Sequence, residues 1–187
     1  MADKIVFDIE TKTPFASQDT IKILEASVIG VYSYLEDKYY CFEEKEFNLF
    51  GEMARRAGLL VGFSSKRFDV PVLEKYFNFN LGAIPHYDIL ERIENSFGRR
   101  VGLAVLAEAN LQITKSGKGL DAVEFWDRGE IEKLKSYCIQ DVKVTKEIFD
   151  LIVNQGYLWV PQRDVPQMAK VLLEYKEPEE SVQTLLI

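Results

Sequence analysis

Two periods of hydrophobic residues alternate along the chain and predict its secondary structure. Short apolar or alternating runs bounded by polar turns predict strands, whereas apolar residues spaced three or four apart predict helices. The expected strands cover residues 4–7, 26–34, 38–42, 58–63 and 157–161. The expected helices cover residues 47–57, 69–77, 89–97, 101–109 and 129–153. The pattern begins with strands joined by a short turn and then alternates strands with helices.

This order of elements predicts the fold class. A short polar turn at Glu36 and Asp37 joins two neighbouring strands, so the sheet is expected to begin antiparallel. Helices between later strands favour parallel pairing, which gives an α/β fold with a mixed sheet flanked by helices. We expect one domain over residues 1–160, followed by an extension over residues 161–187 that is partly ordered or serves in interactions.

Composition narrows the class of protein. The chain has 187 residues, of which 47% are hydrophobic and 28% charged, as in soluble globular domains. Its apolar runs are too short for a membrane span, and the start MADKIVF does not resemble a signal peptide, so we expect a cytoplasmic protein. The two cysteines, Cys41 and Cys138, are too few for a zinc site or a disulfide framework. His86 is the single histidine and is expected to be structural.

Net charge is the first clue to chemistry. A formal charge of −7 argues against a nucleic-acid-binding protein when it is considered alone. The objection weakens if several acids hold divalent cations, because the bound ions cancel the charge and attract phosphate.

The stretch KIVFDIETK, residues 4–12, carries the first acidic element. Asp8 and Glu10 directly follow a buried run, and residues two apart on a strand project to the same side, about 7 Å apart. Two neighbouring carboxylates repel, and a hard divalent cation such as Mg²⁺ or Mn²⁺ relieves that repulsion. The alternative is a strand end that opens into solvent, where both acids are hydrated.

The second and third acidic elements are less specific when each is read alone. In VGFSSKRFDVPVL, residues 61–73, Asp69 opens an expected helix and could be an ordinary first-turn acid, as Pro71 would also suit that turn. In YCIQD, residues 137–141, Tyr137 and Asp141 are one helical turn apart beside the apolar stripe. The alternative for Asp141 is a solvated residue at the edge of that stripe.

In combination, the three elements resemble the signature of the DEDD superfamily of 3′-to-5′ exonucleases, which have a ribonuclease H-like fold. Asp8-Ile9-Glu10 resembles its DxE element, Phe68-Asp69 its aromatic-Asp element, and Tyr137 to Asp141 the YxxxD element of the tyrosine (DEDDy) subgroup. The resemblance covers about residues 1–152. One departure is visible, since the family usually has Asn where this chain has Ser64 or Ser65.

The resemblance implies hydrolysis of the last phosphodiester at a 3′ end by two divalent cations, Mg²⁺ or Mn²⁺. Asp8, Glu10, Asp69 and Asp141 would hold the cations, and Tyr137 would orient the attacking water. An unperturbed tyrosine pKa of about 10 makes positioning a better role than general base catalysis. The substrate would be nucleic acid, with single-stranded 3′ ends expected.

Residues that could contact the substrate follow from their positions beside these elements. The backbone of Thr11-Lys12 follows the first element, Lys66 and Arg67 lie in the second, and the flexible basic loop 114–119 carries two lysines. The candidate substrate-binding residues are Thr11, Lys12, Lys66, Arg67, Lys115 and Lys118. Ordinary surface charge is the alternative for each cation. Asp88 could also approach the site, but it ranks below Asp69 because no aromatic-Asp helix opening surrounds it in the same way.

Other readings stay open at this stage. The segment Gln183–Ile187 loosely resembles peptides that dock on DNA sliding clamps. Haloacid dehalogenase phosphatases also begin with an apolar strand and acids, but their DxDxT does not fit here and they need no YxxxD. A catalytically silent nucleic-acid-binding module, or an endonuclease with the same fold, would share all the motifs. No residue identifies a contact to a 2′-hydroxyl, so DNA and RNA are both open.

Overall fold

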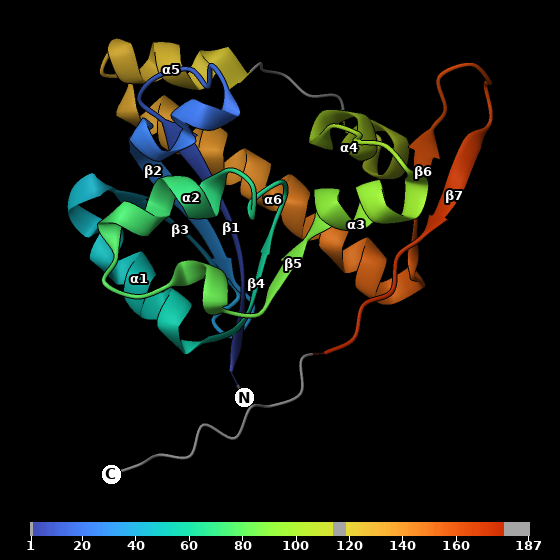
Figure 1. Ribbon diagram of the computed structural model, residues 1–187, viewed down its shortest axis with the longest axis horizontal. Coiled ribbons are helices and arrows are strands. Elements are labelled where there is room, and N and C mark those ends of the chain that lie inside the picture. Colours follow the sequence, from blue (N-terminus) through green and yellow to red (C-terminus); the bar gives the residue numbers. More distant parts are fainter. Residues whose placement is uncertain (1, 114–118, 178–187) are drawn as a thin grey trace.

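The computed structural model describes residues 2–113 and 119–177. Within them, a five-stranded sheet has the order β3-β2-β1-β4-β5 (Figure 1). Its strands are β1 (Asp3–Thr11), β2 (Ala26–Ser33), β3 (Lys38–Glu43), β4 (Ala57–Gly62) and β5 (His86–Asp88). The β1–β2 and β2–β3 pairs are antiparallel, whereas the β1–β4 and β4–β5 pairs are parallel. The expected mixed α/β sheet with antiparallel first strands is therefore confirmed.

Helices cover both faces of this sheet. The α-helices are α1 (Phe47–Arg56), α2 (Asp69–Leu73), α3 (Ile89–Phe97), α4 (Leu103–Leu111), α5 (Gly119–Asp127) and α6 (Ile131–Gln155). Short 3₁₀ turns are η1 (Gln18–Ile23), η2 (Glu44–Glu46), η3 (Glu74–Tyr76) and η4 (Leu81–Ala83). The long helix α6 crosses one face, and α1 and α2 lie on the other (Figure 1). No helix within the described residues combines the length and apolar character needed to cross a bilayer.

Strand β1 contributes to two hydrophobic clusters because its side chains alternate between the faces. Ile5, Phe7 and Ile9 pack in the cluster that contains Phe50 of α1. Val6 packs in the other cluster, which contains residues of α6. Asp8 and Glu10 share the parity of Val6, so the backbone directs both acids toward the face that α6 covers.

Two elements were not anticipated from the hydrophobic pattern. Helix α5 lies between the basic loop and α6, where no helix was expected. Strand β7 (Met168–Leu172) pairs with β6 (Tyr157–Pro161) in an antiparallel hairpin that spans residue 160, the expected end of the domain. The expected helix over residues 69–77 is shorter, since α2 gives way to η3 at Glu74. The strand expected over residues 4–7 is longer, because β1 continues through both acids to Thr11. The other expected elements agree with the structure to within about two residues.

The first residues beyond the hairpin pack against the body of the domain. Tyr175 contacts the rings of Tyr87 and Phe149, with centroids 5.7 Å and 5.0 Å away. Glu177 forms an ion pair with Lys4 at 2.6 Å. These contacts hold residues 175–177, within the expected extension 161–187, against the domain. The clamp-like segment Gln183–Ile187 lies outside the described residues.

Candidate active site

The carboxyl half of β1 carries the first acidic pair as an integral part of the sheet. Asp8 pairs with Gly30 and Glu10 with Val28 of β2, so the strand continues through both acids instead of fraying into solvent. The register shifts only after Glu10, at Thr11. Both acids are partly buried. Two like charges held together on a half-buried strand form a site that a bound cation would stabilise.

Gly30 allows α6 to approach these acids closely. A Cβ at Gly30 would lie 2.7 Å from Sγ of Cys138 and 2.9 Å from Cγ2 of Val142, so any larger residue would push the helix away. The Cys138 thiol instead reaches the strand below and donates a hydrogen bond to the carbonyl oxygen of Asp8 at 3.6 Å. Tyr137 and Asp141 lie on the same stretch of α6 and are thereby brought close to the carboxyl half of β1.

Asp69 joins the second element to the first. It is the first residue of α2, is 3% exposed, and its Oδ1 accepts a hydrogen bond from the backbone N–H of Ile9 at 3.1 Å. Burial raises the pKa of Asp69 to about 7, and the charge of nearby Asp88 adds to the effect. A solvated first-turn acid would show neither the burial nor the bond to a distant strand. Asp69 is therefore more than a helix-capping residue.

One cleft brings the three segments together. Its volume is about 330 Å³, and its lining includes all five residues of the acidic elements, Asp8, Glu10, Asp69, Tyr137 and Asp141. The other lining residues are Ile9, Phe15, Gln18, Phe63, Ser64, Arg67, Phe68 and Arg100. A larger and more apolar cavity of about 590 Å³ lies against α4, α5 and α6 and shares Tyr137 and Asp141 with it. Only the smaller cleft contains the β1 carboxylates, so it is the candidate active site.

The donor atoms suit a hard divalent cation. Among the described residues, one group of possible ligand atoms lies within 4.8 Å of one another, from Asp8, Glu10 and Cys138. A hydrogen bond with Cys41, together with burial, raises the pKa of the Cys138 thiol well above its usual range, so it stays protonated and is a poor ligand. The carboxylates are oxygen donors of the kind that Mg²⁺ and Mn²⁺ prefer. Asp69 and Asp141 line the same cleft outside this tight group.

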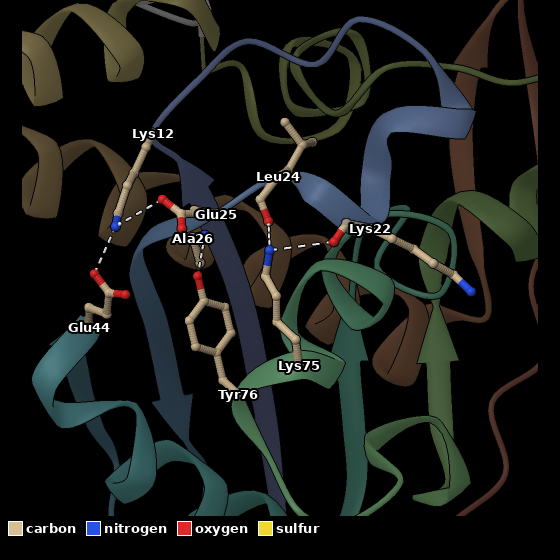
Figure 2. Close-up of polar contacts among 8 residues, drawn as sticks. All are labelled: Lys12, Lys22, Leu24, Glu25, Ala26, Glu44, Lys75 and Tyr76. Atoms are coloured by element: carbon tan, nitrogen blue, oxygen red, sulfur yellow. Dashed lines mark hydrogen bonds and ion pairs between the residues drawn. The ribbon is translucent and has the colours of Figure 1, made fainter.

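Lys12, a predicted substrate contact, is paired within the protein. Its ammonium lies 2.8 Å from Glu44 and 3.3 Å from Glu25, as Figure 2 shows. The side chain of Thr11 is likewise used internally, because its hydroxyl donates to the carbonyl oxygen of Thr13 at 2.7 Å. Neither side chain lines the cleft. The backbone N–H of Lys12 is also used internally, because it donates to the carbonyl oxygen of Glu25 at 2.9 Å.

The segment that follows β1 is anchored from the neighbouring η3 turn. Lys75 donates to the carbonyl oxygens of Leu24 and Lys22, and the backbone N–H of Ala26 donates to the Tyr76 hydroxyl at 3.1 Å (Figure 2). Residues 15 and 18, at the start of this segment, line the cleft. At the cleft itself, the Gln18 side-chain amide donates to the carbonyl oxygen of Arg67 at 3.1 Å.

The predicted basic contacts of the second element are also ion-paired. Lys66 lies 2.7 Å from Glu91, and Arg67 lies 3.0 Å from Glu94. Arg67 nevertheless lines the cleft, whereas Lys66 does not. Both pairs are exposed and therefore weak, so they can exchange for phosphate. Lys115 and Lys118 lie outside the described residues.

Asp88 organises the turn before Asp69. It is 1% exposed, and its carboxylate accepts hydrogen bonds from the backbone N–H groups of Ser64, Lys66 and Glu91 at 3.0, 3.0 and 3.2 Å. It thus caps α3 and fixes the Ser64–Lys66 turn. Asp88 was considered a weaker candidate site residue than Asp69, and in the structure Asp88 does not line the cleft.

Within that turn, Ser64 has the unusual backbone. Its φ is 65°, in the left-handed region that Asn tolerates better than Ser. Ser65 is fully buried and shares a 2.8 Å hydrogen bond with Nε2 of His86. Burial lowers the pKa of His86 to about 4, so it is neutral and serves as the expected structural histidine.

Arg100 is a cleft residue that sequence reasoning did not single out. It lies in the loop between α3 and α4, lines the cleft, and its guanidinium donates to the Ser64 hydroxyl at 3.1 Å. The sequence offers only the Arg99-Arg100 pair in a turn as a signal, and that pair alone does not indicate which arginine faces the site. Phe15 is a second such residue; it is 48% exposed and lies edge-to-face with Phe68 at 5.5 Å.

Comparisons with known proteins agree with the fold. The family model of the RNase H superfamily matches residues 5–153, which is most of the chain, and the chain therefore belongs to the RNase H superfamily. A search of curated protein sequences gives no match. Among solved structures, the chain is similar to the family B DNA polymerase from the hyperthermophilic archaeon Pyrobaculum calidifontis, with a TM-score of 0.61 and 18% sequence identity.

That structural match covers 82% of this chain but only 25% of the polymerase chain. At this identity the match establishes a shared fold. The superfamily match and the acidic cluster together favour a nuclease.

Proposed function

We propose that the protein is a metal-dependent 3′-to-5′ exonuclease of the DEDDy type, which releases nucleoside monophosphates from nucleic-acid 3′ ends. The observation that carries this proposal is the single cleft lined by Asp8, Glu10, Asp69, Tyr137 and Asp141, from three distant segments. A structural acid pair would need no tyrosine and no third segment beside it. A haloacid dehalogenase phosphatase, which would act on small phosphomonoesters, would not explain the Tyr137 to Asp141 element.

The carboxylates would hold two divalent cations, Mg²⁺ or Mn²⁺. Asp8, Glu10, Asp69 and Asp141, which line the cleft together, would be their ligands. Bound cations of this kind lower the pKa of water and stabilise charge on phosphoryl oxygens. The raised pKa of Asp69 fits a ligand position, because a cation replaces the proton that the buried carboxyl otherwise retains.

The remaining cleft residues would position the substrate. The Tyr137 hydroxyl would hold and orient the attacking water, since a phenol is a poor base at neutral pH. Arg100 lines the cleft with donors beyond the one used by Ser64, and an arginine fork matches a phosphate. The exposed ring of Phe15 at the cleft offers a surface on which the terminal base could stack.

The test is digestion of matched single-stranded DNA and RNA oligomers in Mn²⁺. With a 5′ label, we expect a ladder that shortens one nucleotide at a time; with a 3′ label, we expect labelled mononucleotide from the start. EDTA and an Asp8→Ala variant should abolish both. Tight binding of the oligomers without any release would instead support a silent binding module. Cutting of a circular strand would identify an endonuclease.

A further inference from the structure

The β6–β7 hairpin lies beyond residues 5–153, so the superfamily match does not cover it. It projects from the side of the domain where α3 and α4 lie (Figure 1). Its inner face is apolar and buried through Leu158, Val160 and Val171, which join the α6 cluster. Asn110 of α4 fixes β6 further, because its amide exchanges two 2.8 Å hydrogen bonds with the backbone of Trp159. The hairpin is therefore a firmly held part of the fold.

Its outer face carries aromatic and aliphatic side chains that are exposed. The register pairs Tyr157 with Leu172, Trp159 with Lys170, and Pro161 with Met168, and these residues share one face. Trp159 is 40% exposed and Leu172 is 68% exposed. The Lys170 ammonium lies 3.9 Å from the ring centroid of Tyr157. An exposed apolar face with aromatics marks a binding surface.

The charges of the hairpin favour an anionic partner, with Lys170 on the outer face and Arg163 and Asp164 in the loop between the strands. Residues 157–172 carry Arg163 and Lys170 against Asp164 alone, a local excess of one positive charge in a chain whose net charge is −7. Lys170 also occupies the middle of β7, which pairs only with β6 among the described strands. Two copies paired antiparallel about that position would place Lys170 opposite itself, which is destabilising. A phosphate backbone is complementary where a second copy is not.

A chain of contacts connects this face to the candidate active site. Arg99 and Arg100 are adjacent in the loop between α3 and α4. Arg100 lines the cleft and bonds to Ser64, whereas Arg99 donates to the carbonyl oxygen of Pro161 on β6. Two consecutive guanidinium groups thus lie between the cleft and the hairpin. A strand leaving the cleft along them would reach the outer face.

We propose that the outer face of the β6–β7 hairpin binds single-stranded nucleic acid on the 5′ side of the end held in the cleft. Bases stack on Trp159 and Tyr157, while Lys170 and Arg163 meet phosphates. Aromatic side chains on an open sheet face, flanked by cations, are suited to such sequence-tolerant stacking. The link to the cleft rests on the proposed exonuclease function, whereas binding to the hairpin requires no turnover.

The binding test uses the fluorescence of one tryptophan. The chain has two, so a Trp126→Phe variant leaves Trp159 as the sole reporter. In EDTA, which prevents turnover, titration with a twelve-nucleotide oligothymidylate should quench Trp159, and the affinity should fall as salt rises. Absence of quenching would overturn the proposal. Because no hydrolysis is measured, the result is independent of whether the protein proves to be an exonuclease.

Matched variants distinguish base stacking and charge from non-specific hydrophobic binding. In the wild-type background, anisotropy of a labelled oligomer in EDTA should show about tenfold weaker binding for Trp159→Ala and for Lys170→Glu. Leu172→Ala changes the same face without removing an aromatic ring or a charge, and should bind within about twofold of wild type. Equal losses for all three variants, or none, would contradict the proposal. A dimer that Leu172→Ala dissociates would show that the face binds a second copy.

Turnover gives a second readout if the exonuclease proposal holds. Trp159→Ala should raise KM for a twelve-nucleotide oligomer about tenfold and leave KM for a dinucleotide unchanged, because a dinucleotide fills only the cleft. An equal effect on both lengths would mean that the variant disturbs the cleft itself and would contradict a distal platform.

Discussion

The carboxylate of Asp69 accepts a hydrogen bond from the backbone N–H of Ile9, the residue between Asp8 and Glu10. This contact joins the middle acidic element to the first one, and Asp69 is almost completely buried there. It explains how a carboxyl from the opening of α2 enters a site that is built on β1.

Stability in the absence of metal should depend on the protonation of Asp69. Its pKa is raised from 3.8 to about 7, so the folded state holds this proton more tightly than the unfolded state does. The resulting stability is fully present below pH 3.8 and is lost as pH rises toward 7. Asp69→Asn removes this dependence, because the amide oxygen still accepts from Ile9 and carries no charge.

The measurement is urea unfolding of wild type and Asp69→Asn in EDTA at several pH values between 5 and 8. We expect the free energy of unfolding of Asp69→Asn, relative to that of wild type, to increase by at most about 1.4 kcal/mol per pH unit as pH rises toward 7. Asp19→Asn, an exposed acid, is the control and should keep a constant difference. A constant difference for Asp69→Asn as well would contradict the buried, proton-retaining carboxyl.

Asp88 should matter for stability more than its charge suggests. Asp88→Ala leaves three backbone N–H groups, of Ser64, Lys66 and Glu91, without their acceptor. We expect the free energy of unfolding to fall by about 2–4 kcal/mol, and by less for Asp88→Asn, which retains one acceptor oxygen. Glu91→Ala, which removes only an exposed pair with Lys66, should cost less than about 1 kcal/mol. Equal losses for Asp88→Ala and Glu91→Ala in chemical denaturation would refute this role.

Gly30 should be required for the approach of α6 to the sheet. Gly30→Ala places a methyl group within 3 Å of Cys138 and Val142, so the helix that carries Tyr137 and Asp141 must shift. The expected cost is about 1–3 kcal/mol of stability, accompanied by weaker Mn²⁺ binding. Gly102→Ala is the control, since nothing lies within 4 Å of its added Cβ. If both variants melted at the same temperature as wild type, the approach of α6 to Gly30 would not be as close as the structure shows.

Ser64→Asn should stabilise the protein, because Ser64 holds a left-handed φ of 65° that Asn adopts more readily. The gain should be about 0.5–1 kcal/mol in urea unfolding. Ser65→Asn is the contrasting variant, since Ser65 is fully buried against Gly62 and a larger side chain there should destabilise. A destabilising Ser64→Asn, or a stabilising Ser65→Asn, would contradict this account of the turn.

The sequence was most informative where local pattern and chemistry coincide. Strand periodicity placed Asp8 and Glu10 on one side, and helical spacing placed Tyr137 and Asp141 on one face, because both relations depend only on backbone geometry. The proximity of Asp69 to Ile9 joins residues 60 apart in sequence, and only the family resemblance indicated it. Arg100 escaped notice because a turn arginine has no periodicity to reveal its direction.

The same reasoning explains the elements that the hydrophobic pattern did not reveal. Helix α5 is short and follows a glycine-rich basic loop, which indicates a turn more strongly than a helix. Strand β7 alternates weakly, with Lys170 and exposed Met168 and Leu172 on its outer face, and gains its conformation from pairing with β6. The internal pairs of Lys12 were equally hidden, since Glu25 and Glu44 come from distant segments.

The central claim is that carboxylates from three segments hold divalent cations in one cleft, and Mn²⁺ binding measured by electron paramagnetic resonance tests it most directly. Wild type should remove Mn²⁺ from the free-ion signal in a saturable way, whereas Asp8→Asn and Asp141→Asn should lose most of that binding. Tyr137→Phe should bind Mn²⁺ like wild type, and Asp19→Asn controls for the change in net charge. Mn²⁺ binding that is absent from wild type, or unchanged in Asp8→Asn and Asp141→Asn, would contradict the account.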